Sequence, residues 1–131
     1  MNIEVFSLCD AATVDAGGKL NILGAFDTIW AANIPVVYPH FAVALRVRFN
    51  SIEKGEHKVA FNLVDVDGKR ILPPATGVIN VNPPHEQRTV STNSIINVQM
   101  IKIEKYGEYS LDLSINGENL ASLPLFVVKP Q

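Results

Sequence analysis

The sequence predicts an all-β protein: a single-domain antiparallel β-sandwich of about eight strands, immunoglobulin-like or C2-like, with little or no helix. Apolar residues alternate along the chain. In residues 41–49, large apolar side chains at odd positions alternate with small or basic ones. This period of two is that of a strand with one face in a core. Turn residues recur between such stretches, and no window of about eleven residues or more carries the 3.6-residue stripe of a helix.

Length and composition limit the classes of protein that fit. The 131 residues predict one domain, residues 1–131, and 47% hydrophobic against 18% charged residues exclude a disordered chain. The net charge of −2 gives no reason to expect nucleic acid, and no segment has the roughly 20 apolar residues of a membrane span. The single cysteine, Cys9, cannot form an internal disulfide. We therefore expect a cytoplasmic protein with neither nucleic acid nor membrane as partner.

Alternation and turn signals together predict the positions of the strands. We expect them at 2–9, 19–32, 41–50, 57–66, 77–82, 94–103, 108–116 and 119–128. The turns between them are predicted at Gly17-Gly18, Lys54-Gly55, Asp67-Gly68 and Asn116-Gly117.

Three strands carry irregularities. The stretch 19–32 is interpreted as one bent strand, in which Gly24, where the period slips, marks a bulge or a close backbone crossing. Proline pairs on both sides of 77–82 predict an edge strand or a segment that switches sheets, because proline cannot donate to a sheet ladder. In 119–128 the apolar phase changes, which predicts a bulge between Ala121 and Pro124.

The strand at 41–50 is expected to bury Val43, Leu45, Val47 and Phe49 and to direct Arg46 and Arg48 outward. In the simplest hairpin with 57–66, Arg48 lies opposite Lys58 and His57 lies opposite Phe49. Because like charges opposite each other are unfavourable, we expect acidic residues on a strand next to the two arginines, with an anion-binding patch as the alternative.

The order of these segments resembles a known family. "LCDAATVDAGGKLNILGAFDTI", "FAVALRVRF", "HKVAFNLVDVDGK" and "YGEYSLDLSINGENLASLPLFVV" together are similar to small bacterial proteins catalogued only as a domain of unknown function. The resemblance spans nearly the whole chain. It implies a compact β-sandwich and no assigned activity.

A looser similarity is to immunoglobulin-like domains. The segment from Lys105 to Leu111 is similar to their tyrosine corner, with Tyr109 two residues before the position that usually holds the second core cysteine. Leu111 stands at that position, and the chain has no cysteine pair. The similarity therefore supports two packed sheets and leaves their topology open.

Candidate chemistry is sparse. Asp65-Val66-Asp67-Gly68 begins like a calcium loop but lacks the further acids, so it is interpreted as a hairpin turn, with calcium binding as an alternative. His40, His57 and His85 have no zinc-ligand spacing. No nucleophile motif is present. We expect a protein that is not an enzyme and holds no metal or cofactor, with an undetected hydrolase as a remote alternative.

The loop between 30 and 40 is the predicted interface. It is unusually apolar for an exposed connection, and its aromatic residues are of the types enriched at binding hot spots. We predict that it contacts another protein or a second copy of the chain through Trp30, Ile34, Val37, Tyr38 and His40. Plugging the end of its own sandwich is the structural alternative. A small-ligand or calcium-binding module is the functional alternative.

Overall fold

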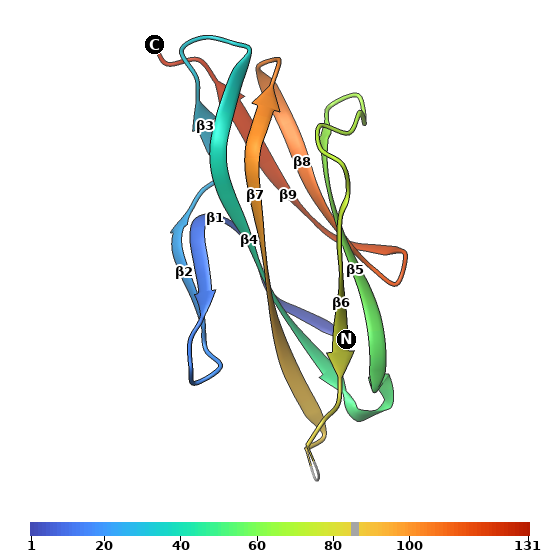
Figure 1. Ribbon diagram of the computed structural model, residues 1–131. Coiled ribbons are helices and arrows are strands. Elements are labelled where there is room, and N and C mark those ends of the chain that lie inside the picture. Colours follow the sequence, from blue (N-terminus) through green and yellow to red (C-terminus); the bar gives the residue numbers. More distant parts are fainter. Residues whose placement is uncertain (85–86) are drawn as a thin grey trace.

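The protein is a sandwich of two β-sheets in a computed structural model that describes residues 1–84 and 87–131 (Figure 1). The strands are β1 (Asn2–Val14), β2 (Leu20–Ala25), β3 (Thr28–Trp30), β4 (Val36–Asn50), β5 (Gly55–Asp65), β6 (Ala75–Val81), β7 (Thr89–Ile103), β8 (Gly107–Ile115) and β9 (Glu118–Val128). A 3-10 turn, Ser51–Glu53, follows β4. No described segment is an α-helix, and none of the described elements is a helix long and apolar enough to cross a membrane.

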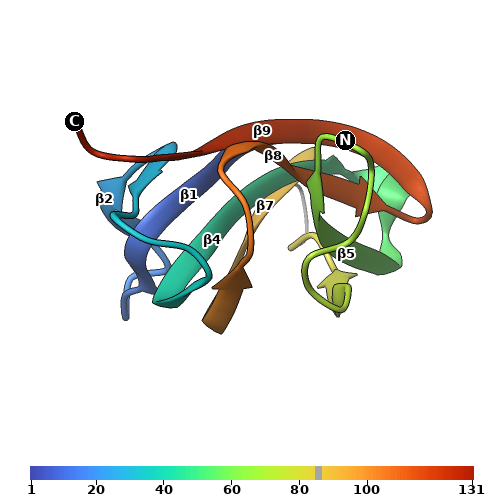
Figure 2. The same cartoon turned by 90° about the horizontal axis from the view of Figure 1, so that it is seen from above.

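The strands form a four-stranded sheet in the order β2-β1-β4-β7 and a five-stranded sheet in the order β3-β9-β8-β5-β6. Viewed from above, β1, β4 and β7 run together in one layer while β9, β8 and β5 form the other (Figure 2). All pairings are antiparallel except that of β3 with β9, which is parallel. The all-β sandwich is thus confirmed, with this one departure from an antiparallel arrangement.

The predicted bent strand at 19–32 is wrong: it is two strands in different sheets. β2 ends at Ala25 and pairs with β1, whereas β3 begins at Thr28 and pairs with β9. Gly24 lies where the strand leaves the first sheet. Its backbone φ is +69°, which residues with a side chain rarely adopt. A Cβ atom at this position would also lie 2.4 Å from Asp10 Oδ2. This division gives nine strands where about eight were expected.

The core lies between the sheets and follows the predicted alternation. Val43, Leu45, Val47 and Phe49 of β4 are fully buried against β5 and β8 side chains, so the predicted inward face is confirmed. The predicted hairpin between 41–50 and 57–66 is wrong, because β4 and β5 belong to opposite sheets. His57 still reaches Phe49, with ring centroids 4.7 Å apart, but it does so across the core.

The predicted loop 30–40 is also partly wrong, because β4 already begins at Val36. Val36 to His40 pair with β7, from Val36 opposite Ile103 to His40 opposite Gln99. β1 pairs with β4 only from Ala42 onward, so Pro39 lies where β4 has one neighbour. A proline is tolerated there as it is at a sheet edge, because no second neighbour requires its missing N–H.

The outer face of the four-stranded sheet is covered by its own hairpin. β1 pairs with β4 up to Cys9 and then leaves it, so that its second half pairs with β2. Cys9, Ala42 and Ala44 are completely buried on this face, under Ala12 and Leu20 of the hairpin. The hairpin tip reaches as far as β7, where Asn93 Nδ2 donates to the Gly18 carbonyl at 3.0 Å. The small residues of β4 therefore make room for a third layer, which is coloured blue at the left of Figure 1.

Below this covered patch the same face is charged. Arg46 and Arg48 point outward, and each guanidinium donates to Glu4, at 3.0 and 2.8 Å. Hydrogen bonds from Arg48 and Arg46 hold the pKa of Glu4 below its usual range, against the effect of burial. The acidic neighbour expected for these arginines is thus confirmed, while the predicted Arg48–Lys58 contact is wrong.

The outer face of the five-stranded sheet is open and polar. Asp112 lies near its centre, where Ser110 and Ser122 donate to the same carboxylate oxygen at 2.7 and 2.6 Å. Ala60 lines a shallow hollow on this face together with Thr76 and Ser114. No strand of the described chain covers it.

The register of β8 and β9 contains the expected bulge, one step earlier than predicted. Asn116 and Gly117 have φ of 55° and 82°, as a two-residue hairpin turn requires. Leu113 pairs with Ala121 and Ser114 with Asn119, so Leu120 is the extra residue. The bulge restores the inward phase of the last strand.

Candidate binding site

The five residues of the predicted interface loop do not form one surface. Ile34 and Tyr38 pack on the core, with the Tyr38 ring 6.1 Å from Phe26. Trp30 is 67% exposed and alternates with buried Ile29, so it lies on the outer face of the five-stranded sheet. Val37 is 48% exposed on the opposite outer face. The two exposed side chains therefore point away from each other.

The predicted histidines lie in separate places. His40 Nε2 contacts Asn97 Oδ1 at 3.1 Å on the four-stranded sheet. His57 lies between the carbonyl of Glu53, 2.6 Å from Nε2, and the Asn116 amide, 2.9 Å from Nδ1. His85 lies outside the described residues. Within residues 1–84 and 87–131 no three histidine, cysteine or acidic side chains gather as a metal site.

The Asp65–Gly68 stretch is a tight turn built around Asp65. This carboxylate is almost fully buried, and its Oδ1 accepts from the backbone N–H groups of Asp67 and Lys69, both at 2.9 Å. Lys105 Nζ lies 3.1 Å from Asp65 and 3.4 Å from Asp67, so its ammonium occupies the space between the carboxylates. The Lys69 N–H, and then Lys105, hold the pKa of Asp65 below its usual range. The two carboxylates of the turn are thus paired with a lysine of the same chain.

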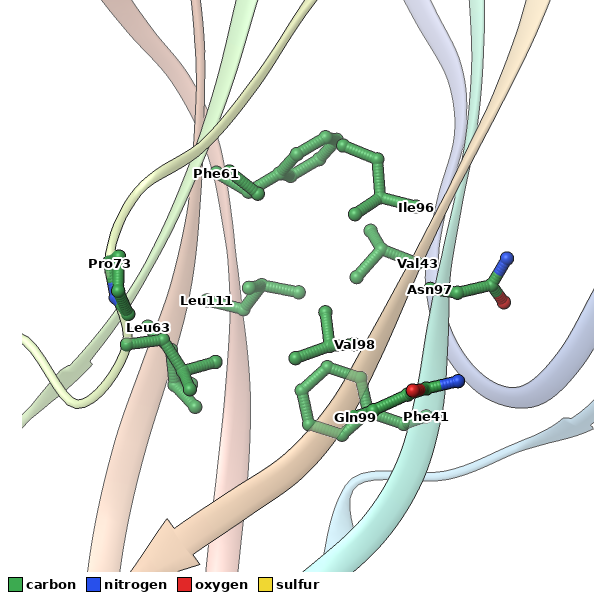
Figure 3. Close-up of a pocket in the computed structure, with 12 residues that line it drawn as sticks. Phe41, Val43, Phe61, Leu63, Pro73, Ile96, Asn97, Val98, Gln99 and Leu111 are labelled. Atoms are coloured by element: carbon green, nitrogen blue, oxygen red, sulfur yellow. The ribbon is translucent and has the colours of Figure 1, made fainter.

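A cavity of about 290 Å³ opens between the two sheets, beside β7. The side chains that line it come from both layers, and none is titratable: Phe41, Val43, Phe61, Leu63, Leu72, Pro73, Ala75, Ile96, Val98 and Leu111. Figure 3 shows Phe61, Leu63 and Leu111 facing Val43, Ile96 and Val98 across the space. Asn97 and Gln99 also border it, but their amides point away, so they contribute main-chain atoms. The lining is that of an apolar ligand pocket.

The cavity exists because β6 stops short. β6 pairs with β5 only from Gly55 to Phe61, where Ala75 lies opposite Phe61. Pro73 and Pro74 precede β6 and interrupt the ladder, so beside Leu63 β5 meets only the connecting segment, whose Ile71 N–H donates to the Leu63 carbonyl at 2.8 Å. β6 is also the edge of its sheet, as the proline pairs predicted. The proline pairs therefore predicted the edge of the sheet, but nothing in the sequence predicted the cavity.

The cavity adjoins the free edge of β7. Among the described residues β7 pairs with β4 alone, and at 15 residues it is longer than the other edge strands β2, β3 and β6. From Thr89 to Ile101 it contains no charge and no proline. Natural edge strands are usually shortened, charged or interrupted by proline, which prevents pairing with another chain. β7 has none of these protections along that stretch.

The direction of the β7 main-chain groups follows from its register. The Ser51 N–H donates to the Arg88 carbonyl at 3.1 Å, and the pairing continues unbroken from there to Phe41 opposite Val98. In an antiparallel ladder, hydrogen-bonded pairs alternate with non-bonded ones. The even-numbered residues from 90 to 98 therefore bond β4. Asn97 and the other odd-numbered residues direct their N–H and C=O groups to the free edge.

The fold and its cavity define an all-β sandwich with an apolar opening between its sheets. Residues 4–128 match DUF6941, a family of unknown function, and the chain belongs to this family. The predicted resemblance to a domain of unknown function is thus confirmed. Neither a curated protein nor a solved structure matches the chain.

Proposed function

We propose that the protein is a non-catalytic binding module that contacts another protein by adding an extended segment of that protein to the free edge of β7. The observation that carries this proposal is the edge itself: no other strand of the described chain pairs with it along the uncharged stretch from Thr89 to Ile101. In strand addition, main-chain hydrogen bonds supply affinity and neighbouring pockets supply specificity. The predicted loop at 30–40 is not needed for this contact.

Proline substitution at Asn97 tests the proposal. Asn97→Pro removes one N–H that faces the free edge, and Asn97→Ala is the matched control because it keeps the N–H while removing the same side chain. The probe is the capped peptide Ac-Thr-Thr-Thr-Leu-Thr-Thr-Thr-NH2, whose sequence does not occur in this chain. We expect the peptide to protect the free-edge amides of β7 from hydrogen exchange in the wild type and in Asn97→Ala, and not in Asn97→Pro. Equal protection in both variants, or none in the wild type, contradicts the proposal.

A small apolar ligand in the cavity is the second candidate function. The volume of about 290 Å³ and the apolar lining support it. Toluene is a suitable probe, because it needs no main-chain partner. Shifts of the Val43 and Leu63 methyl resonances with toluene, together with no response to any peptide, favour this candidate over strand addition.

The remaining parts of the proposal concern topology and location. We propose an immunoglobulin-like connection of the strands, with β1-β4-β7 as strands A, B and E and β9-β8-β5 as G, F and C. The Tyr109 hydroxyl donates to the Lys105 carbonyl at 2.6 Å, as in a tyrosine corner, which supports this assignment. A cytoplasmic location fits the unpaired thiol of Cys9. Bacterial origin stays a prediction.

A further inference from the structure

The cavity and the free edge of β7 lie close enough to act together. Ile96 and Val98 alternate with Asn97 along β7, so their side chains enter the cavity while the Asn97 main chain faces the edge. A strand added to that edge continues the four-stranded sheet. Its inward side chains therefore lie beside Ile96 and Val98, at the opening of the cavity.

We infer that the cavity takes one large apolar side chain, such as leucine or phenylalanine, from an extended peptide segment of another protein. This inference rests on the proposed strand addition and names the chemistry of the partner. None of the described residues that line the cavity is charged, and its polar edge consists of main-chain atoms at Asn97 and Gln99, whose side-chain amides point away. A charged side chain would lose its hydration there without gaining a partner.

The size of the cavity agrees with this occupant. An apolar cavity of about 150 Å³ is enough to bind benzene, and this one measures about 290 Å³. A phenylalanine or leucine side chain therefore fits, together with part of the peptide backbone. Leu72 and Pro73, which also line the cavity, come from the β5–β6 connection, and Pro73 lies on the side away from Val43 and Ile96 (Figure 3).

A host peptide series tests the inference. The probe is Ac-Thr-Thr-Thr-X-Thr-Thr-Thr-NH2 with X as alanine, leucine or phenylalanine, titrated into the full chain and followed by NMR. We expect leucine and phenylalanine peptides to bind at least about tenfold more tightly than the alanine peptide, because only they bury a large apolar side chain in the cavity. The Asn97→Pro variant should weaken all three peptides alike, because it acts on the main chain.

Filling the cavity separates the pocket from the edge. Ala75 lines the cavity from β6, so Ala75→Leu should abolish the preference for large X while the alanine peptide binds as before. Ala75→Val, a smaller change, should reduce the preference and serves if Ala75→Leu does not fold.

The outcomes distinguish strand addition to β7 from the occupation of the cavity by a side chain. Peptides that bind β7 with equal affinity for every X overturn the cavity inference and leave strand addition standing. A preference for large X that survives Ala75→Val and Ala75→Leu also overturns it. No binding by any peptide overturns both. A dimer that Asn97→Pro dissociates overturns the choice of partner, because a second copy of the chain then covers the edge.

Discussion

The two outer faces of the sandwich differ in what covers them. On the four-stranded sheet, Ala42 and Ala44 are completely buried beneath the β1–β2 hairpin. On the five-stranded sheet, Ala60 is half-buried in a shallow hollow near the half-buried Asp112 cluster, and no described strand covers it. All three are alanines that alternate with core residues on a central strand. The comparison shows that small side chains on the outward face can have two meanings: a place where another layer packs closely, or an ordinary wet surface.

The buried inner face sets the scale for this comparison. Leu45 follows Ala44 on β4, points into the shared core and is fully buried. We expect Leu45→Ala to lower the free energy of unfolding by about 2–5 kcal/mol, because the removed atoms leave a cavity. Denaturant unfolding measures this change. A loss well below 1 kcal/mol would mean that the core is not packed as described.

Enlarging the covered alanine tests the third layer directly. Ala44→Leu should lower the free energy of unfolding by about 1–3 kcal/mol, because the hairpin leaves no room for added methylene groups. Ala60→Leu is the matched control and should stay within about 0.5 kcal/mol of the wild type. Equal effects on the two faces would show that the hairpin does not pack on Ala44 in solution.

The close approach of Gly24 to Asp10 offers a finer test of how the hairpin is held. Gly24 and Gly18 both have positive φ, at 69° and 77°, but only a Cβ atom at Gly24 meets a neighbour, 3.2 Å from Asp10 Cβ. Gly24→Ala should therefore be less stable than Gly18→Ala by about 1 kcal/mol, the lower end of overpacking costs. Thermal and denaturant unfolding of the pair measures the difference. Identical stabilities would show that Asp10 does not exclude a Cβ atom at Gly24.

The smallest expected effect concerns the charged half of the covered face. Because Arg48 and Arg46 lower the pKa of Glu4 in the folded protein, the ion pair stabilises the protein above the usual carboxylate pKa, and this stabilisation is lost as the pH falls through the lowered value. Glu4→Gln should lower stability at neutral pH and flatten its decline in acid. Glu118→Gln, at the first residue of β9 and in no ion pair among the described residues, is the control. The free energy of unfolding is measured at several pH values for the wild type and both variants. If it falls in acid by the same amount in all three proteins, the prediction is contradicted.

The residues of the inner face could be predicted from the sequence more fully than the packing of the outer faces and edges. Alternation along β4 located Val43 and Leu45, because burial on one side imposes a period of two whatever the topology. The same pattern could not show that Ala44 is covered, since a small residue is equally compatible with solvent. It also could not assign β4 and β5 to opposite sheets, because a turn at Lys54-Gly55 fits a hairpin and a crossover alike.

The candidate site illustrates the same limit. Pro73 and Pro74 predicted that β6 is an edge, but the cavity depends on where β6 ends relative to β5 and on which strand faces it from the other sheet. Those relations join residues distant in the chain, such as Leu63 and Ile96. The apolar loop at 30–40 attracted the functional prediction because its composition is conspicuous, whereas the edge of β7 is formed by ordinary strand residues.

The parallel pairing of β3 with β9 has a consequence for how the chain folds. It joins residues 28–30 to residues 126–128, so a strand made early in synthesis can pair only after a much later strand has been made. Pairings of such long sequence separation close slowly, in the range of milliseconds to seconds for β-sandwiches. During that interval the uncharged stretch of β7 is exposed beside an unfinished sheet, which is a hazard for aggregation. The edge of β7, proposed here to bind a partner, is thus also the edge through which nascent chains could pair with one another and aggregate.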